Sequence, residues 1–134
     1  MTVENAAEFN REVMMFAKTL TPKKFELFFK KIALEALSRL VQRTPVDTGR
    51  ARGNWQLTVN YAADWEIDTE DKTGSRTIAL GRNRLARMSN HCLGQIVFIS
   101  NNVDYIEDLE EGASHQAPRG IVQPVLDELT QMFR

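Results

Sequence analysis

The chain has very little cysteine and no long apolar run. Its 134 residues include one cysteine, Cys92, which excludes an internal disulfide and suits a reducing compartment. No apolar stretch approaches the roughly 18 residues of a membrane span, and the N-terminus lacks the basic start and apolar stretch of a signal peptide. We therefore expect one soluble domain, residues 1–134, large enough to bury a core without disulfide bonds or a structural metal.

The chain also lacks a strong net charge, but its charges are unevenly distributed. The formal net charge is −1, which excludes a global field that would recruit nucleic acid. Residues 1–63 carry +4, residues 64–71 carry −5, residues 72–103 carry +5 and residues 104–134 carry −5. Blocks of alternating sign favour contacts between complementary surfaces of neighbouring molecules.

Motifs for catalysis and metal binding are sparse. His91 and Cys92, with His115 distant, resemble a nucleophile and base or a soft-metal set, but they lack the paired spacing of a zinc site. The acids of Asp64–Asp71 lack the glycine-pivoted spacing of a calcium loop. Gly49–Gly53 precedes a strand, whereas a phosphate-binding loop opens a helix. We expect no enzyme, cofactor or metal; a hydrolase that uses Cys92 and a histidine is a weaker alternative.

Helical periodicity marks the first third of the chain. Thr2 can cap a first helix whose apolar side chains recur at steps of four and three: Phe9, Val13, Phe16 and Leu20. Thr21 followed by Pro22 is typical of a new N-cap and first helical position, so we expect a second helix to about Arg43. Its broad apolar face predicts more than one packing partner.

Two later segments predict strands. The first alternates apolar and polar residues, the period of a strand with one buried face, and its apolar members are Trp55, Leu57, Val59 and Tyr61. The second, Gln95–Ser100, has a continuous apolar centre, so we expect a strand that is covered on both faces and lies centrally in the sheet. Residues 63–68 could add a further strand segment.

The segment between these strands begins as an acidic loop. Asp64–Ser75 has turn-forming residues and little periodicity, which indicates a solvated loop. Ser75 can cap a helix that runs to about Asn90, although Gly81 is unfavourable inside it.

The last third returns to helical periodicity. One or two helical turns are expected around Tyr105, closed by Gly112, and a final helix begins near Ile121 with Pro124 in its first turn. The predicted fold class is therefore α+β: a small, mostly antiparallel or mixed sheet packed against several helices, with N-terminal helices and a C-terminal helix.

The pivot between the helical and strand patterns is Thr44–Trp55. Pro45 disfavours helical geometry at Thr44, Asp47 can accept a hydrogen bond from the backbone two residues on, and Gly49 allows a positive φ. These features alone predict a turn that connects the second helix to the first strand.

Two features suggest more than a connector. Arg50 and Arg52 point the same way if the chain is extended there, and Trp55 begins the apolar face of the strand. The pivot would then present two guanidinium groups beside a buried anchor.

The pivot also carries a family resemblance. Residues 45–56, Pro-Val-Asp-Thr-Gly-Arg-Ala-Arg-Gly-Asn-Trp-Gln, resemble the opening motif of the tail-completion proteins of tailed phages, the minor tail protein Z-like group. A second block of the resemblance follows in the expected order and comprises Asn101–Ile106, Leu109, Glu110, Gly112, Ser114, Gln116–Pro118 and Gly120. The two blocks cover roughly a quarter of the chain; Ala113 and Ile121 depart from the family pattern, where an aromatic residue and Met are frequent.

The resemblance implies a structural protein of the head–tail neck. Such a protein completes the head-proximal end of the tail and enables head–tail joining without catalysis or a cofactor. The expected partners are copies of itself in a ring, the tail tube or tail terminator, and head-connector proteins, with genomic DNA nearby and no membrane. The expected location is the neck of the virion, after synthesis in the cytoplasm of the bacterial host. Tail-terminator and head-closure roles stay open.

Candidate site residues follow from the two blocks and the charge pattern. We expect the turn to be fixed and the sheet anchored by Asp47, Thr48, Gly49, Arg50 and Trp55, and Tyr105 and Leu109 to dock the short helix. The candidate interface set is Arg76, Arg84, Arg87, Tyr105, Glu110, Gly112, Gln116 and Pro118. One candidate pairing joins the basic run Arg76–Arg87 to the acids of Asp64–Asp71 or Glu107–Glu111 in a neighbouring copy.

The alternative is a small nucleic-acid-binding domain. Arg50, Arg52 and the basic run Arg76–Arg87 could follow a phosphate backbone. The run contains no interleaved aromatic residue, and the whole chain is slightly acidic, which weakens this interpretation.

Overall fold

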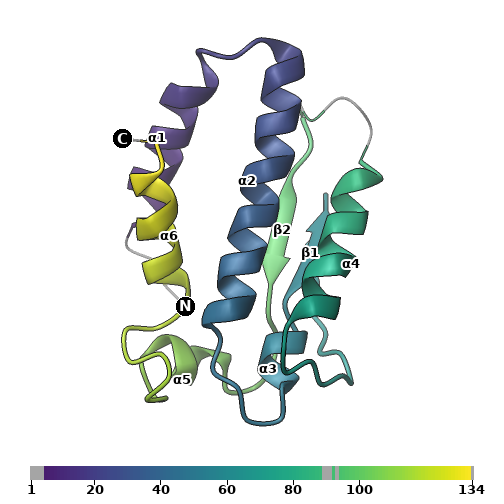
Figure 1. The fold of residues 1–134 in the computed structure, drawn as a ribbon, viewed down its shortest axis with the longest axis vertical. Coiled ribbons are helices and arrows are strands. Elements are labelled where there is room, and N and C mark those ends of the chain that lie inside the picture. The colour runs from purple at the N-terminus through teal and green to yellow at the C-terminus, as the bar shows by residue number, and fades with distance from the viewer. Residues whose placement is uncertain (1–4, 89–91, 93, 134) are drawn as a thin grey trace.

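The computed structural model describes residues 5–88, 92 and 94–133 and has the α+β fold that the sequence predicts (Figure 1). Helices alternate with two short strands along the described chain. In order, the elements are α1 (Ala6–Ala17), α2 (Pro22–Arg43), α3 (Arg50–Gly53), β1 (Gln56–Val59), α4 (Ser75–Ala86), β2 (Val97–Ser100), α5 (Ile106–Glu110) and α6 (Val122–Gln131).

The long helix α2 is the centre of the molecule. The Thr21 hydroxyl accepts a hydrogen bond from the Lys24 N–H at 3.3 Å, and Pro22 occupies the first turn, so the helix begins as predicted. Figure 1 shows α1 and α6 on one side of α2, and α4 with the strands on the other. The broad apolar face of α2 therefore has two sets of packing partners, as the sequence predicts.

Gly81 explains how closely α4 approaches α2. A Cβ atom at this position would collide with the Leu37 side chain, which is fully buried in the core. Glycine inside a helix costs about 1 kcal/mol of helix propensity relative to alanine. α4 forms despite this cost, because glycine lets the helix lie close to α2.

The two strands form one antiparallel pair. Gln56 lies opposite Ser100 and Val59 opposite Val97. The polar face of β1 is buried rather than solvated, because the segment that follows the strand folds over it: the Gln56 amide donates to the Trp65 carbonyl at 2.7 Å, and the Thr58 hydroxyl donates to the Tyr61 carbonyl. Tyr61, expected on the buried face, lies beyond the strand and is exposed.

The predictions of a central second strand and of a strand at 63–68 were wrong. The sheet of the described chain has two strands, so β2 lies at an edge, and all four of its residues are half-buried. Residues 63–68 are irregular: the Asn54 side chain holds the backbone of Ile67 in place of a strand ladder. An apolar run alone does not distinguish a strand buried on two faces from one that helices partly cover.

The helix ends agree with the local sequence signals. α6 has Pro124 in its first turn, and Gly112, at a φ of 91°, follows α5. Gly74, rather than Ser75, takes the N-cap position of α4. The predicted cap at Thr2 and the predicted end at Asn90 lie outside the described residues.

The core lies between α2 and the elements on both its sides. Its fully buried side chains include Leu37, Val41, Ile121, Val125 and Leu129. The elements that carry the two motif blocks lie at one end of this core, at the bottom of Figure 1.

Candidate functional site

The turn of the first motif block depends on Gly49. Its φ is 92°, and an added Cβ would lie 2.7 Å from the Lys72 nitrogen and 2.8 Å from the Asp71 nitrogen. The Gly49 carbonyl accepts hydrogen bonds from the N–H groups of Gly53 and Asp71, at 2.9 and 3.0 Å. The positive φ was predicted, whereas the close approach of a backbone segment 22 residues later was not.

The role predicted for Asp47 belongs to its neighbour. The Thr48 hydroxyl accepts the hydrogen bond from the backbone two residues on, the Arg50 N–H, at 3.2 Å. Asp47 is exposed and lies beside the turn. Both residue types favour such local bonds, so the sequence did not decide between them.

The two arginines of the motif diverge, contrary to the extended geometry considered for them. Residues two apart in a helix point to different sides, and the chain is helical here, in α3. Arg50 Nε donates to Glu66 Oε1 at 2.7 Å, and its Nη1 donates to Asp68 Oδ1 at 3.2 Å. The hydrogen bond with Glu66 raises the pKa of the Arg50 guanidinium above its usual value.

Arg52 closes the end of α2. Its Nη2 donates to the carbonyls of Gln42 and Thr44, at 3.0 and 2.8 Å, and its Nη1 donates to the Lys72 carbonyl at 2.8 Å. The last carbonyls of a helix lack partners within it and carry partial negative charge, so a cation is favourable there. Both motif arginines are thus engaged within the chain, so the structure does not present the pair of free guanidinium groups that the nucleic-acid alternative used.

Trp55 anchors the pivot as predicted. Its indole N–H donates to the Thr44 hydroxyl at 2.7 Å, and that hydroxyl donates to the Leu40 carbonyl at 2.6 Å. Trp55 is buried, and Thr44 is fully buried. This chain of hydrogen bonds connects the start of β1 to the end of α2.

Asn54 was missed as a functional position in the turn. It is fully buried; its amide donates to the Arg50 and Ile67 carbonyls, at 2.8 and 3.0 Å, and accepts from the Ile67 N–H at 2.6 Å. Periodicity could not have identified it, because its partner is an irregular segment 13 residues later. Its presence within the first motif block was the one available signal.

The two motif blocks bind each other directly. The Gln116 side-chain amide donates to the Val46 carbonyl and accepts from the Val46 N–H, both at 3.0 Å. The Asn101 amide donates to the Ala51 carbonyl at 2.8 Å. Segments separated by 50 and 70 positions are thereby joined through amide side chains that pair with backbone groups.

A groove lies where the two blocks meet. It encloses about 430 Å³. One wall comes from the first block and the other from α5 and the loop after it; the lining residues are Pro45, Val46, Asp47, Thr48, Gly49, Arg50, Ala51, Tyr105, Leu109, Ser114 and Gln116. We call it the motif groove.

Glu110 and Gln116, which we predicted at a contact surface, form hydrogen bonds within their own chain. The Glu110 carboxylate accepts from the N–H groups of Ile121, Val122 and Gln123, at 3.1, 2.7 and 3.2 Å. These N–H groups open α6 and lack partners within the helix, and the partial positive charge of a helix N-terminus favours a carboxylate there. Gln116 and Pro118 are nevertheless exposed, so a contact surface at this loop stays a prediction.

The other residues of the second block divide between structure and surface. A Cβ at Gly112 would collide with the Pro118 carbonyl, so the backbone segments at these two residues lie close together. Leu109 packs against the core and lines the motif groove, as its predicted docking role requires. Tyr105 is 40% exposed and lines the groove instead of docking the helix.

The predicted basic run lies on α4, across the molecule from α5 (Figure 1). Arg76, Arg82, Arg84 and Arg87 are all exposed, and Arg84 Nη1 also donates to the Leu57 carbonyl at 2.8 Å. Tyr61, absent from the predicted set, lines a hollow of about 340 Å³ with Arg84 and Arg87.

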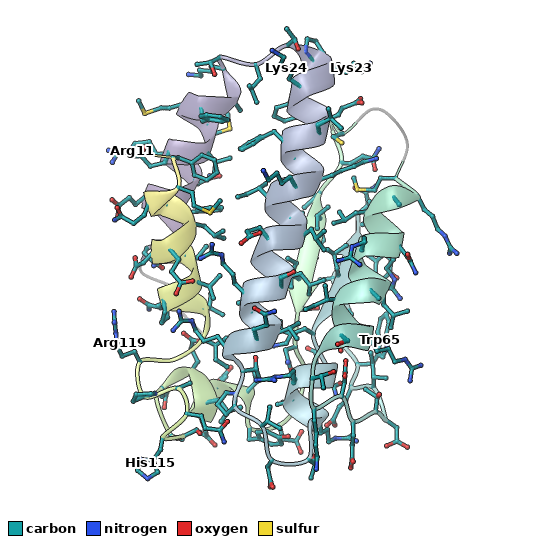
Figure 2. The ribbon with its side chains drawn as sticks, viewed as in Figure 1. Arg11, Lys23, Lys24, Trp65, His115 and Arg119 are labelled. Carbon is teal, nitrogen blue, oxygen red and sulfur yellow. The ribbon has the colours of Figure 1, made fainter. Side chains whose placement is uncertain are left out.

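An aromatic pair lies on the same side as α4. Tyr61 stacks on Trp65 with ring centroids 6.2 Å apart, and Figure 2 shows Trp65 on the α4 side of the molecule. His115, in contrast, projects from the loop after α5 at the opposite lower edge.

Asp71 stabilises the loop that contacts Gly49. Burial alone would raise the pKa of its carboxyl group, but hydrogen bonds from the Thr77 hydroxyl and N–H and from the Gly74 N–H outweigh burial and lower that pKa. The carboxylate therefore accepts hydrogen bonds at the start of α4, where N–H groups have no acceptors within the helix.

Cys92 has the environment of a structural thiol. It is buried, and burial raises its pKa, while the nearby Glu26 raises it further. A thiol with a raised pKa is a poor nucleophile. His91, its proposed partner, lies outside the described residues. The described residues contain no group of three or more His, Cys, Asp or Glu side chains placed to hold a metal, and no described helix is long and apolar enough to cross a membrane.

No protein-family model, curated protein or solved structure matches this chain.

Proposed function

We propose that this protein is a non-catalytic structural component of the head–tail neck of a tailed phage or prophage. It completes the head-proximal end of the tail and enables joining to the DNA-filled head. The observation that carries the proposal is the direct binding between the two motif blocks: Gln116 pairs with the Val46 backbone, and Asn101 binds the Ala51 carbonyl. The residues that resemble the tail-completion family thus form one folded unit with a groove between its halves.

In this role the protein acts through its interfaces. Its partners are further copies of itself in a ring, the tail tube or tail terminator, and head-connector proteins, with the genome passing nearby. It is synthesised in the host cytoplasm and ends in the virion neck. Complementary charged surfaces on different sides of one subunit suit a head-to-tail contact between copies.

The positions of the acidic groups favour one of the two candidate pairings. Glu66 and Asp68 already bind Arg50, and Asp71 binds the start of α4 in its own chain. The acids of Glu107–Glu111 lie across the molecule from α4; Glu110 is likewise bound in its own chain, and the exposed Asp108 is the member that the Arg76–Arg87 run of another copy can face.

Head joining in vitro tests the proposal. Tails and DNA-filled heads are prepared from a phage that lacks this gene, and each is incubated with the purified protein before mixing. We expect infectious particles when the tails are pre-incubated. Recovery through the heads alone would assign the protein to head closure, and the absence of infectious particles with folded protein and competent parts would contradict the neck assignment.

Salt dependence separates this proposal from nucleic-acid binding. The alternative now rests on α4, because Arg50 and Arg52 are engaged within the chain. If α4 followed a phosphate backbone, retention on immobilised duplex DNA would fall steeply with salt concentration. We expect weak retention.

A further inference from the structure

The motif groove has apolar walls and acidic edges. Pro45, Val46, Tyr105 and Leu109 supply apolar surface, and Tyr105 is 40% exposed. Arg50 also lines the groove, but its guanidinium is bound to two carboxylates. A surface of this kind fits a partner that presents an apolar side chain between cations.

One acid lines the groove, and two further acids adjoin its lining residues in the sequence. Asp47 lines the groove from the first block. Asp104 and Asp108 directly precede Tyr105 and Leu109, and both are exposed. Figure 2 shows the nearby cation Arg119 projecting outward from the loop before α6. These acids favour a basic protein surface as the partner of the groove.

The outer face of α4 has the complementary composition. Leu80 is 50% exposed in the middle of the helix. Arg76 lies four positions before it and Arg87 seven positions after it, the spacing that places side chains on one helical face. Residues 72–103 contain no acid, so α4 contributes cations and no carboxylates to this face.

We propose that the motif groove of one copy receives α4 of a second copy. In this contact Leu80 packs against Tyr105 and Leu109, while Arg76 and Arg87 face the acidic edges at Asp47 and Asp108. A large apolar side chain at the centre of a contact, surrounded by charge pairs, is the arrangement in which truncation of one residue removes much of the affinity.

The contact is heterologous because the two surfaces are different and lie on different sides of the subunit. Figure 1 shows α4 along one edge of the molecule and α5 at the opposite lower side. After a first contact one copy keeps a free α4 and the other a free groove, so the assembly grows head to tail and forms a ring when the rotation closes. The inference supplies the subunit contact of the proposed neck ring and rests on that function for its biological setting.

Cysteine cross-linking tests the contact directly. Leu80→Cys and Tyr105→Cys are made as separate variants and treated with a short bismaleimide, alone and as an equal mixture. Cys92 is buried, so it contributes little background. We expect a covalent heterodimer in the mixture alone. Cross-linking of Leu80→Cys to itself would establish a symmetric contact. No cross-linked heterodimer in the mixture, at concentrations where sedimentation shows oligomers, would place the interface elsewhere. Either result overturns the inference.

Charge reversal gives a second, independent measurement. Arg87→Glu and Asp108→Arg should each weaken self-association about tenfold in sedimentation, while a mixture of the two should recover heterodimers because the reversed charges attract. Lys23→Glu is the matched control, since Lys23 is exposed at the far end of α2 in Figure 2. Equal weakening by Lys23→Glu would mean that net charge, rather than this contact, governs association. A protein that remained monomeric at about millimolar concentration would also overturn the inference.

Two readouts separate this inference from the proposed function. A monomeric protein that restores infectious particles would overturn the groove contact and leave the neck role intact. Heterodimers from the charge-reversed mixture without restored infectivity would support the groove contact and contradict the neck role. Loss of duplex-DNA binding in Arg87→Glu, without any change in self-association, would assign the α4 face to nucleic acid.

Discussion

The two ends of the molecule are held together by different kinds of interaction. At the motif end, side chains bind distant backbone groups: Asn54 binds Ile67, Arg52 binds the end of α2, and Gln116 binds Val46. At the opposite end, α1 contains no fully buried residue and packs through aromatic rings. Hydrogen bonds demand particular atoms at particular positions, whereas apolar packing tolerates substitutions of similar volume. The motif end should therefore be the less tolerant of change.

Gly49→Ala should produce the largest loss at the motif end. The variant combines an unfavourable positive φ with a clash against the backbone of residues 71 and 72, and we expect a loss of about 3–4 kcal/mol in the free energy of unfolding. Urea denaturation measures it. Gly94→Ala is the matched control, because Gly94 has a φ of 82° but nothing within 4 Å of an added Cβ. Equal losses in the two variants would show that the close approach at Gly49 is unimportant.

Asn54→Ala should cost about 2–3 kcal/mol, because it removes three hydrogen bonds of a fully buried side chain, one from the Ile67 N–H and two to carbonyls. Asn10→Ala, on the exposed side of α1, is the control and should change unfolding by less than about 0.5 kcal/mol. The same urea titration compares them. A loss below 1 kcal/mol for Asn54→Ala would indicate that water or a shifted loop replaces its hydrogen bonds.

Phe16→Leu tests the tolerance of the other end. Phe16 contacts the rings of Phe28 and Phe133, with centroids 5.0 and 5.4 Å away, and is 40% exposed. Leucine keeps most of the apolar contact, so we expect a loss of about 1 kcal/mol in thermal or urea unfolding. A loss as large as that of Asn54→Ala would remove the contrast between the two ends.

The smallest effect concerns acid stability. The folded state lowers the pKa of Asp71, so its ionised carboxylate stabilises the fold above the ordinary aspartate value of 3.8. This contribution is lost as the pH falls below that value. Unfolding titrations at a series of pH values should show a shallower acid loss for Asp71→Asn than for the parent protein, and identical acid limbs would contradict the assignment.

The sequence predicted those features of the fold that depend only on residues close together in the chain. The Thr21–Pro22 start of α2, the positive φ at Gly49 and the tolerated Pro124 in α6 all follow from nearby residues. Trp55 was also identified as an anchor, because its apolar alternation marks a strand.

Long-range hydrogen bonds could not be predicted in this way. Arg52 as a helix cap, Asn54 as a clamp and Glu110 as the acceptor at the start of α6 each depend on which segments come together in the fold. Their residue types are common on surfaces, so Arg52 was assigned to phosphate and Glu110 to a partner. The motif groove was missed for the same reason, since its walls are 50 or more positions apart in sequence.

The 22 residues of α2 also set a length scale for the molecule. At 1.5 Å per residue this helix is about 33 Å long, and it runs from the Thr21 cap to the arginine that closes its other end. A helix of this length, supported along both sides, behaves as a stiff rod. The motif groove and the aromatic cluster of Phe16, Phe28 and Phe133 are therefore fixed relative to each other, so a displacement at one end of α2 is transmitted to the other without bending.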